Sequence, residues 1–512
     1  MIRCVPQVPL LNPHLNRDMN CYIECMTTAR LLIILAVIGT AVQARAQRVV
    51  DSKLRKPNLI FIMADDLGYG DLACFGSKRI RTPHLDTMAK EGMRFTSYYT
   101  HNVCGVTRAS LMTGCYPMRV GEINNIKHPH PVLHPKEITI AEVLRDAGYA
   151  TALIGKWHLA DSPERGKGPY RLELMPNAQG FDYYFGAPSH NGTTREIPKN
   201  GWRTMLMRNQ ETIENPTNLD QITKRYTDEA IDFIQKHKDE PFFLFLSHTM
   251  PHVVLGASEK FKGKSPGGLF ADAVEEIDDG VGQLLAKLRE LKLEKDTLVI
   301  FTSDNGPWIE GHLAGKGGSD AHYGTAGPLR GAKMMTWEGG QRVPTIAWRP
   351  SMIPAGTESA QIACVMDILP TFAAQAGAKL PDRKLDGIDL SPLLRGEPGA
   401  KGHDTFFYYA FTHLQAVRSG KWKLVLPRPA KPAWTSWSGR MIEAVEKSQL
   451  YDLEADISES NNIAAGHTDI VAQLMKLVES AREDIGDYDR IGKGQRFFDE
   501  GEKRGESKRW LK

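Results

Sequence analysis

Asn58-Leu-Ile-Phe-Ile-Met63, followed at once by Ala64-Asp65-Asp66, is the stretch of sequence that most strongly indicates the fold. A continuous apolar run of this length is typical of a strand that is buried on both faces, and therefore of a parallel or mixed sheet covered by helices. Three later runs, at 150–154, 241–246 and 297–302, have the same character. Each of the four runs ends in polar residues with catalytic potential.

Helical patterns separate these runs, at 140–147, 226–238 and 271–291. Their alternation predicts an α/β fold in which a large mixed, mostly parallel sheet is sandwiched by helices. In such folds ligands bind beyond the carboxyl ends of the strands. We therefore expect the residues that follow the four strands to meet in one site: Asp65 and Asp66, Lys156 and His158, His248 and His252, and Asp304 and Asn305. Of these we assign His248 to the core or to the surroundings of the site.

A second, smaller domain is predicted after the loop Gly396-Glu-Pro-Gly399. Residues 50–396 would form the large domain that carries the site. Residues 400–490 contain strand patterns at 406–409, 414–418 and 422–426 and an amphipathic helical pattern at 470–482. They predict a small α+β domain with an antiparallel sheet and one helix. Residues 491–512 have the composition of a polar tail.

The N-terminus has the features of an export signal. Arg30 precedes the apolar run 31–38, and Ala44-Arg45-Ala46 offers small residues before a cleavage point. We expect 1–46 to be a removed signal peptide, with Met26 as a candidate true start, and the mature protein to be periplasmic or secreted. The alternative is a disordered extension. The apolar run is too short to span a bilayer well, so no stable membrane anchor is expected.

Composition narrows the classes of function. The net charge is +3 over 512 residues, which gives no indication of a nucleic-acid partner. Four cysteines follow the signal, and they are too few for a disulfide scaffold. One disulfide is possible, but the sequence does not indicate its pairing; the four are Cys74, Cys104, Cys115 and Cys364.

The acidic residues after the first and fourth strands are candidate metal ligands. Asp65, Asp66 and Asp304 offer carboxylate oxygens and Asn305 an amide oxygen. Such hard donors suit Ca²⁺ or Mg²⁺, and the mature chain has no Cys-x-x-Cys pair that would indicate zinc. Each motif alone is also typical of a capped or tight turn. Two of them at the ends of two buried strands favour a metal site.

Cys104 is the candidate nucleophile. A helical pattern at 109–112 places Cys104 or Thr107 near a helix N-terminus, where backbone N–H groups attract an anion. Arg108 adds a planar donor fork suited to an oxyanion. The alternative is a buried structural cysteine at a helix start.

The chain resembles the sulfatase family of the alkaline-phosphatase-like superfamily over about residues 55–480. Cys104-Gly-Val-Thr-Arg-Ala-Ser-Leu-Met-Thr-Gly114 is similar to the family signature Cys-x-Pro-Ser-Arg-x-x-x-Leu-Thr-Gly. Gly148-Tyr-Ala-Thr-Ala-Leu-Ile-Gly-Lys-Trp-His-Leu159 resembles the second signature throughout. Further segments resemble the family in order, namely Asp65-Asp66-Leu-Gly-Tyr-Gly-Asp71, Asp304-Asn305-Gly306, Gly327-Pro-Leu-Arg-Gly-Ala-Lys333 and Trp337-Glu-Gly-Gly-Gln-Arg-Val-Pro344.

The resemblance implies an arylsulfatase-like enzyme that depends on formylglycine. A maturation enzyme would oxidise Cys104 to formylglycine, whose hydrate would attack sulfur. One calcium ion would be held by the Asp65, Asp66, Asp304 and Asn305 positions and would also contact converted residue 104.

Other family positions imply roles around the sulfate. Arg108 and Lys156 would hold the nucleophile, and His158 would bond its second hydroxyl and act as base during elimination. His252 would contact the leaving oxygen, with Lys333 as its partner.

Four further positions qualify this assignment. His312 and His322 lie in the Gly-rich loop after Asn305 and are candidates for substrate contact. Val106 stands where the signature has Pro, which puts efficient maturation in question. Cys115 stands where the family usually has a cation.

The predicted function is hydrolysis of a sulfate ester, on a sulfated sugar or an aryl alcohol. Two alternatives stay open. The first is a phosphate or phosphonate ester hydrolase on the same scaffold. The second is a non-catalytic binder of sulfated glycans, if Cys104 is not converted.

Overall fold

The computed structural model describes residues 56–120, 133–160, 170–191, 204–309, 323–432, 434 and 439–498. The predicted signal peptide at 1–46, the end of the predicted tail, and both His312 and His322 lie outside these residues. Within the described ranges no helix combines the length and apolar character needed to cross a membrane.

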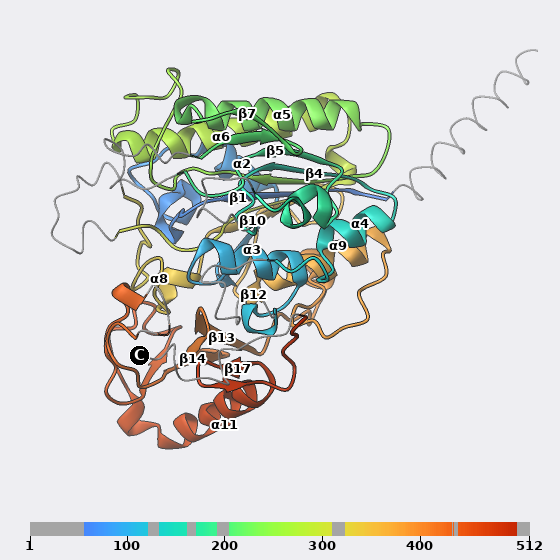
Figure 1. Ribbon diagram of the computed structural model, residues 1–512. Helices are drawn as coiled ribbons and strands as arrows, with labels where there is room; N and C mark the ends of the chain where they lie inside the picture. Colours follow the sequence, from blue (N-terminus) through green and yellow to red (C-terminus); the bar gives the residue numbers. More distant parts are fainter. Residues whose placement is uncertain are drawn as a thin grey trace, which may run out of the picture. The chain divides into compact units, whose positions relative to one another are not determined.

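A ten-stranded mixed sheet forms the centre of the large domain (Figure 1). Its middle strands β9, β1, β8, β4 and β5 are parallel, and antiparallel strands occur toward both edges. The strands, in spatial order, are β11 (Thr357–Ser359), β2 (Met93–Phe95), β10 (Thr345–Trp348), β9 (Thr297–Ser303), β1 (Asn58–Ala64), β8 (Phe242–Ser247), β4 (Ala150–Gly155), β5 (Tyr183–Gly186), β6 (Leu206–Arg208) and β7 (Glu211–Glu214).

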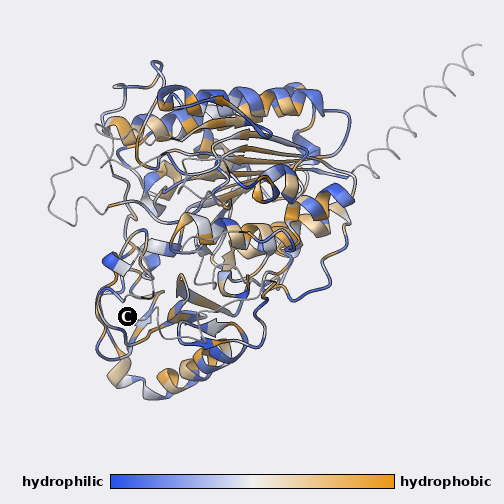
Figure 2. Cartoon of the chain, viewed as in Figure 1, coloured by the Kyte–Doolittle hydropathy of each residue, from blue (hydrophilic) through white to orange (hydrophobic). Residues whose placement is uncertain are grey.

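Both faces of the sheet are buried, because alternate side chains of β1 enter two different cores. Leu59, Phe61 and Met63 pack in one core and Ile60 and Ile62 in the other. Figure 1 shows α5 (Ile222–Lys236) and α6 (Gly268–Glu290) on one side of the sheet and α3 (Cys104–Thr113), α4 (Ile140–Asp146) and α9 (Ile368–Ala376) on the other. Helix α2 (Pro83–Glu91) packs against α6. Hydrophobic residues dominate the sheet, whereas the helices carry polar residues as well (Figure 2).

The smaller C-terminal part has its own antiparallel sheet. Its strands are β13 (Thr405–Ala410), β14 (His413–Ser419), β15 (Trp422–Val425) and β16 (Gln449–Asp452), and α11 (Thr468–Asp484) packs on β14. The shorter elements of the chain are β3 (Tyr98–Tyr99), β12 (Ala363–Cys364), β17 (Gly486–Asp487), β18 (Arg490–Ile491), α8 (Glu338–Gln341) and α10 (Ser391–Leu394).

The topology brings the chemistry-bearing strand ends together. β9, β1, β8 and β4 are consecutive in the sheet and mutually parallel, so their carboxyl ends lie along one edge. The last residues of the strands are in register, with Ala64 opposite Ser303 and Gly155 opposite Ser247. The predicted fold class is confirmed, and so is the expectation that four distant segments converge.

Several predicted elements differ in extent. The helix predicted at 109–112, with Thr107 or Cys104 near its start, begins at Cys104 and extends to Thr113. The helix predicted at 226–238 starts at Ile222, one turn earlier. The fourth C-terminal strand, β16, was not expected. The four cysteines that the structure describes are all free, so the possible disulfide does not form among them.

Candidate active site

Two sharp turns present the site residues just beyond the strands. Asp66 follows β1 with φ of 69°, and His158 follows β4 with φ of 61°. Both values lie in the left-handed region, which few side chains other than Asp, Asn and His enter readily. These turns direct the chain away from the sheet edge as soon as each strand ends.

Three buried ion pairs hold the acidic residues in place. Lys156 Nζ lies 2.5 Å from Asp65 Oδ2, Lys333 Nζ lies 2.6 Å from Asp66 Oδ1, and Arg108 Nη2 lies 2.8 Å from Asp304 Oδ2. All six side chains are at most 1% exposed. Burying charges is costly even when they are paired, so stability alone is a weak reason for such a cluster.

Three oxygens of the same cluster have no hydrogen-bond partner. They are Asp65 Oδ1, Asp66 Oδ2 and Asn305 Oδ1, and all are buried. An unsatisfied buried polar atom costs about 1–3 kcal/mol, so three such oxygens in one cluster form a place where a ligand would be stabilising. Asn305 Nδ2 donates to Asp66 Oδ1 over 2.8 Å, which turns the amide oxygen away toward the unpaired side. Carboxylate and amide oxygens arranged in this way fit a hard divalent cation such as Ca²⁺.

Cys104 lies next to this oxygen cluster. The Sγ atom of Cys104 and one carboxylate oxygen each of Asp65 and Asp304 all lie within 4.8 Å of one another. Cys104 is the first residue of the ten-residue helix α3 and is buried. Its Sγ lies 3.2 Å from Nδ1 of His158. Burial raises the pKa of this thiol, and the nearby charges of Lys156 and Lys333 oppose that shift.

Arg108 joins the helix to two strands. Its Nη1 donates to the carbonyl of Lys156 over 2.9 Å and to the hydroxyl of Ser247. Burial opposes the charge of Arg108, but Asp304 and Asp65 raise the pKa of the guanidinium on balance. Arg108 therefore stays charged while it links α3 to the ends of β4 and β8.

Lys333 is also charged in the site. Burial lowers the pKa of its ammonium, but Asp66 and the other acidic groups outweigh burial and raise it. Its backbone is held by Met334, whose N–H donates to Asn102 O over 2.7 Å and whose φ is 75°. Lys333 lies 5.5 Å from the ring centroid of Trp308.

His252 faces the cluster from the loop after β8. Its Nε2 lies 3.8 Å from Asp66 Oδ2, one of the unpaired oxygens. Burial, followed by the charges of Lys333 and Lys156, lowers the pKa of the ring well below its usual value. Asn191 supports the loop by donating to the carbonyls of Thr249 and His252.

Three of these contributors were not predicted from the sequence: Ser247, Asn191 and His190. The ring of His190 lies 5.5 Å from that of His158 and 5.5 Å from that of His252, so it lies beside both predicted histidines. His190 and Asn191 sit in a loop with no motif of their own. Ser247, the last residue of β8, was detectable only as a polar residue that ends an apolar strand.

The structure brings together ten of the predicted site residues: Asp65, Asp66, Cys104, Arg108, Lys156, His158, His252, Asp304, Asn305 and Lys333. His248 is buried in the core and neither ring nitrogen has a partner, which agrees with its assignment away from the chemistry. Burial lowers the pKa of His248 to about 3. His312 and His322 lie outside the described residues.

Two family models match the chain, and together they cover most of it. A model of the sulfatase family matches residues 57–378, and a model of the C-terminal region of aryl-sulfatase matches residues 401–500. The chain belongs to the sulfatase family. It is a sulfuric ester hydrolase with the alkaline-phosphatase-like architecture described above.

The alignments with three curated relatives of this sulfatase cover most of each relative's length. Human steryl-sulfatase is 33% identical, with 84% of this chain and 88% of the relative covered. Human arylsulfatase A is 36% identical, with 83% and 87% covered. Pig N-acetylgalactosamine-6-sulfatase is 37% identical, with 78% and 76% covered.

Solved structures show the same fold. The PsFucS1 sulfatase from Pseudoalteromonas sp. has a TM-score of 0.70 at 28% identity, covering 85% of this chain and 91% of that one. Ps i-CgsB, solved in complex with k-i-k-neocarrahexaose, has a TM-score of 0.67 at 29% identity, covering 83% and 92%.

Proposed function

We propose that this sulfatase hydrolyses sulfate esters with a formylglycine made from Cys104 and one bound calcium ion. The observation that carries the proposal is the position of Cys104: it starts a helix, lies 3.2 Å from His158, and adjoins buried oxygens that lack a partner. A structural cysteine would need none of these neighbours.

Calcium would be held by Asp65, Asp66, Asp304 and Asn305. The unpaired Oδ1 of Asp65, Oδ2 of Asp66 and Oδ1 of Asn305 support this assignment. When bound, the ion would neutralise charge on the sulfate oxygens and act as a Lewis acid. The aldehyde hydrate of converted residue 104 would supply two hydroxyls, one to attack sulfur and one to expel sulfate.

The protein's own side chains divide the remaining work. Arg108 and Lys156 are proposed to orient the hydroxyls of residue 104, because both are fixed by carboxylates and hold positive charge beside the thiol. His158 Nδ1 is proposed to take the proton of the second hydroxyl when sulfate is expelled, which its 3.2 Å contact supports.

His252 and Lys333 are proposed to act at the leaving oxygen. His252 Nδ1 faces the carbonyl of Val253, so Nε2 is the atom that faces the cluster. Lys333 carries positive charge nearby. A bound sulfate ester brings negative charge next to both groups, which favours the protonated imidazole needed for donation from Nε2.

We also propose that the chain is exported, with 1–46 as signal, that 50–396 and 400–490 are its two domains, and that a formylglycine-generating enzyme is its maturation partner. The substrate class we propose is a sulfated glycan or aryl ester, which agrees with the carrahexaose named for a structural relative.

The reaction class is tested by assaying 4-nitrophenyl sulfate and 4-nitrophenyl phosphate side by side. We expect kcat/KM for the sulfate to exceed that for the phosphate by at least about 100-fold, and to be lost in Cys104→Ala. A phosphate preference, or full activity in Cys104→Ala, would contradict the proposal.

A further inference from the structure

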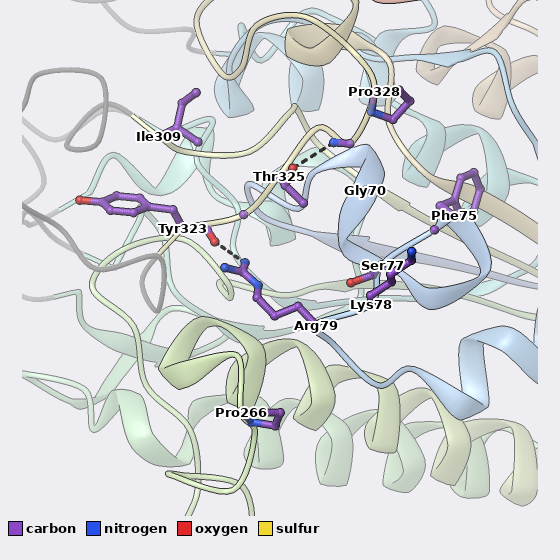
Figure 3. A pocket seen from close by; sticks show the side chains of 13 residues that line it. Gly70, Phe75, Ser77, Lys78, Arg79, Pro266, Ile309, Tyr323, Thr325 and Pro328 are labelled. Atoms are coloured by element: carbon purple, nitrogen blue, oxygen red, sulfur yellow. Dashed lines mark hydrogen bonds between the residues drawn. The ribbon is translucent and has the colours of Figure 1, made fainter.

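A pocket of about 850 Å³ is lined by residues of the loop after β1 and by residues that surround the undescribed segment 310–322 (Figure 3). We call it the Lys78 pocket. The residues that matter for its chemistry are Phe75, Lys78, Arg79, Ile309, Tyr323 and Thr325. In Figure 3 Ile309 and Tyr323 lie on one side of it and Phe75 on the other, with Arg79 between them.

The lining of the Lys78 pocket is cationic. Lys78 and Arg79 line it, and no carboxylate is among the described lining residues. Lys78 is exposed and forms no ion pair with any described residue. Arg79 is half-buried, and its Nη2 donates to Tyr323 O over 2.6 Å, which fixes the guanidinium against the wall. A charged pair of this kind, one fixed and one adjustable, suits an oxyanion.

Asp71 is a buried acid close to the pocket that interacts electrostatically with Arg79. Both of its oxygens accept backbone N–H groups, from Gly68 over 2.8 Å and from Thr325 over 2.9 Å. Asp71 is not among the residues that line the pocket, so its carboxylate offsets part of the charge of Arg79 and leaves Lys78 as the unpaired cation of the described lining.

The pocket is close to the site along three separate segments of chain. Gly70 lines the pocket four residues after Asp66, and Ile309 lines it four residues after Asn305. Pro328 lines it five residues before Lys333. Five residues span at most about 18 Å, so the pocket and the oxygen cluster lie within the length of a short oligosaccharide.

We propose that the Lys78 pocket binds a second anionic group, a sulfate or carboxylate on a neighbouring sugar, of an oligosaccharide whose scissile sulfate occupies the site. This inference rests on the proposed function, and it selects polyanionic glycans over simple aryl esters as substrates. The rings of Phe75 and Tyr323 lie on either side of Arg79 and offer apolar surface for the sugar that carries the second anion.

Two linked anions bind more tightly than one, because the second contact forms at high effective concentration. The gain depends on charge, so it should weaken as salt screens Lys78. Binding of a monosulfated aryl ester should not share this gain, since it has no second anion.

The test measures equilibrium binding of size-defined heparin, chondroitin sulfate and ι-carrageenan tetrasaccharides by calorimetry. The protein is the full chain with calcium and Cys104→Ala, which removes turnover. Lys78→Glu is compared with Lys295→Glu, the same change of charge on an exposed lysine that precedes β9. Seven residues of strand, about 23 Å, separate that lysine from the end of β9 that carries Asp304.

We expect at least one tetrasaccharide to bind, with a Kd that Lys78→Glu raises at least tenfold and Lys295→Glu raises less than twofold. Arg79→Gln provides a second variant and should also raise the Kd. Absence of binding by all three tetrasaccharides, or equal effects of Lys78→Glu and Lys295→Glu, would overturn the proposal. Turnover of 4-nitrophenyl sulfate by the protein with Cys104 intact reports separately on the proposed function.

Discussion

Asp66 forms hydrogen bonds with three other residues of the site. Its backbone adopts a left-handed conformation, its Oδ1 accepts from Lys333 and Asn305, and its N–H donates to Asp304 over 3.2 Å. Only Oδ2 has no partner. A residue so constrained presents one oxygen in one direction, which is the behaviour expected of a metal ligand.

We predict that calcium removal abolishes turnover and lowers thermal stability, and that added calcium restores both. At 100 times its Kd, a ligand that binds only the folded state stabilises it by about 2.7 kcal/mol. Asp66→Asn should lose both effects, because Asn tolerates the same backbone while removing the charge. Scanning calorimetry and an aryl sulfate assay measure the two effects.

Asp279→Asn is the control, since Asp279 pairs with Lys260 on the exposed surface of α6. It should retain the calcium response in full. Unchanged activity in protein shown by elemental analysis to contain no metal would contradict the calcium assignment.

His252→Ala should discriminate between leaving groups. Without a proton donor at the leaving oxygen, sulfate esters of alkyl alcohols should lose about 10²–10⁴-fold in kcat/KM. Acidic phenols leave as phenolates without a proton donor, so kcat/KM for their sulfate esters should fall far less. Parallel kinetics on one alkyl and one nitrophenyl sulfate check this, and equal losses on both would remove the proton-donating role from His252.

At the scale of elements, the close approach of β4 and β8 brings Arg108, Lys156 and Ser247 together. Gly155 ends β4 with φ of 117°, and a Cβ there would lie 1.7 Å from Ser247 O. The same carbonyl accepts from Lys156 N over 2.7 Å. Only glycine allows the two strand ends to meet so closely.

We predict that Gly155→Ala destabilises the protein by more than about 3 kcal/mol and displaces Lys156, with loss of activity. Gly148→Ala is the matched control, because Gly148 precedes the same strand with φ of 85° and has no atom within 4 Å of an added Cβ. Gly148→Ala should lower the free energy of unfolding only by the backbone strain, about 1–2 kcal/mol. Urea unfolding of both variants measures the difference, and equal costs would refute the steric argument.

The sequence predicts the elements that carry strong patterns. β1, β4, β8 and β9 are continuous apolar runs, and each is found within a residue or two of its predicted bounds. β2, β11 and β6 have three residues each, which is too short for periodicity to appear, and their pairing depends on distant partners.

The site residues that could be predicted are those that a local sequence pattern marks. Residues that follow buried strands or belong to a signature were found, whereas His190 and Asn191 reach the site from a loop. Their contribution arises from three-dimensional contacts that no local pattern records.

At the scale of the whole molecule, α11 is attached to the large domain by charge. Asp484, near the end of α11, forms an ion pair with Arg119, and Lys384 Nζ lies 2.7 Å from the same carboxylate. The hydrogen bond from Arg119, with Lys384, lowers the pKa of Asp484 to about 2. Arg119 is buried and also holds Asp386 at 2.7 Å.

We predict that Asp484→Ala costs about 1–3 kcal/mol near neutral pH, because a buried guanidinium loses one of its two carboxylates. The folded pKa is below the unfolded one, so this stabilisation is present above about pH 4 and is lost as pH falls toward 2. Asp489→Ala, which removes an exposed pair with Arg490, should cost less than about 0.5 kcal/mol. A cost for Asp484→Ala that does not shrink in acid would contradict the ionic explanation.

Maturation also concerns the whole chain, because conversion of Cys104 would precede burial of α3. Val106 stands in the place of the signature's Pro, and it packs with Val103, Met334 and Phe411 in the folded protein. The first helical hydrogen bond of α3 is Thr107 N to Val103 O, so a proline at 106 would remove no helical bond. Val106→Pro should therefore fold and should raise conversion in a foreign host, where the native sequence is expected to be converted incompletely.

The most direct test of the account is the mass of the peptide that contains Cys104, taken from active protein made in its native host. The account predicts the aldehyde of formylglycine in place of the thiol, in proportion to specific activity, and a larger aldehyde fraction for Val106→Pro than for the native sequence in a foreign host. An unmodified thiol in fully active native protein would contradict the formylglycine mechanism itself.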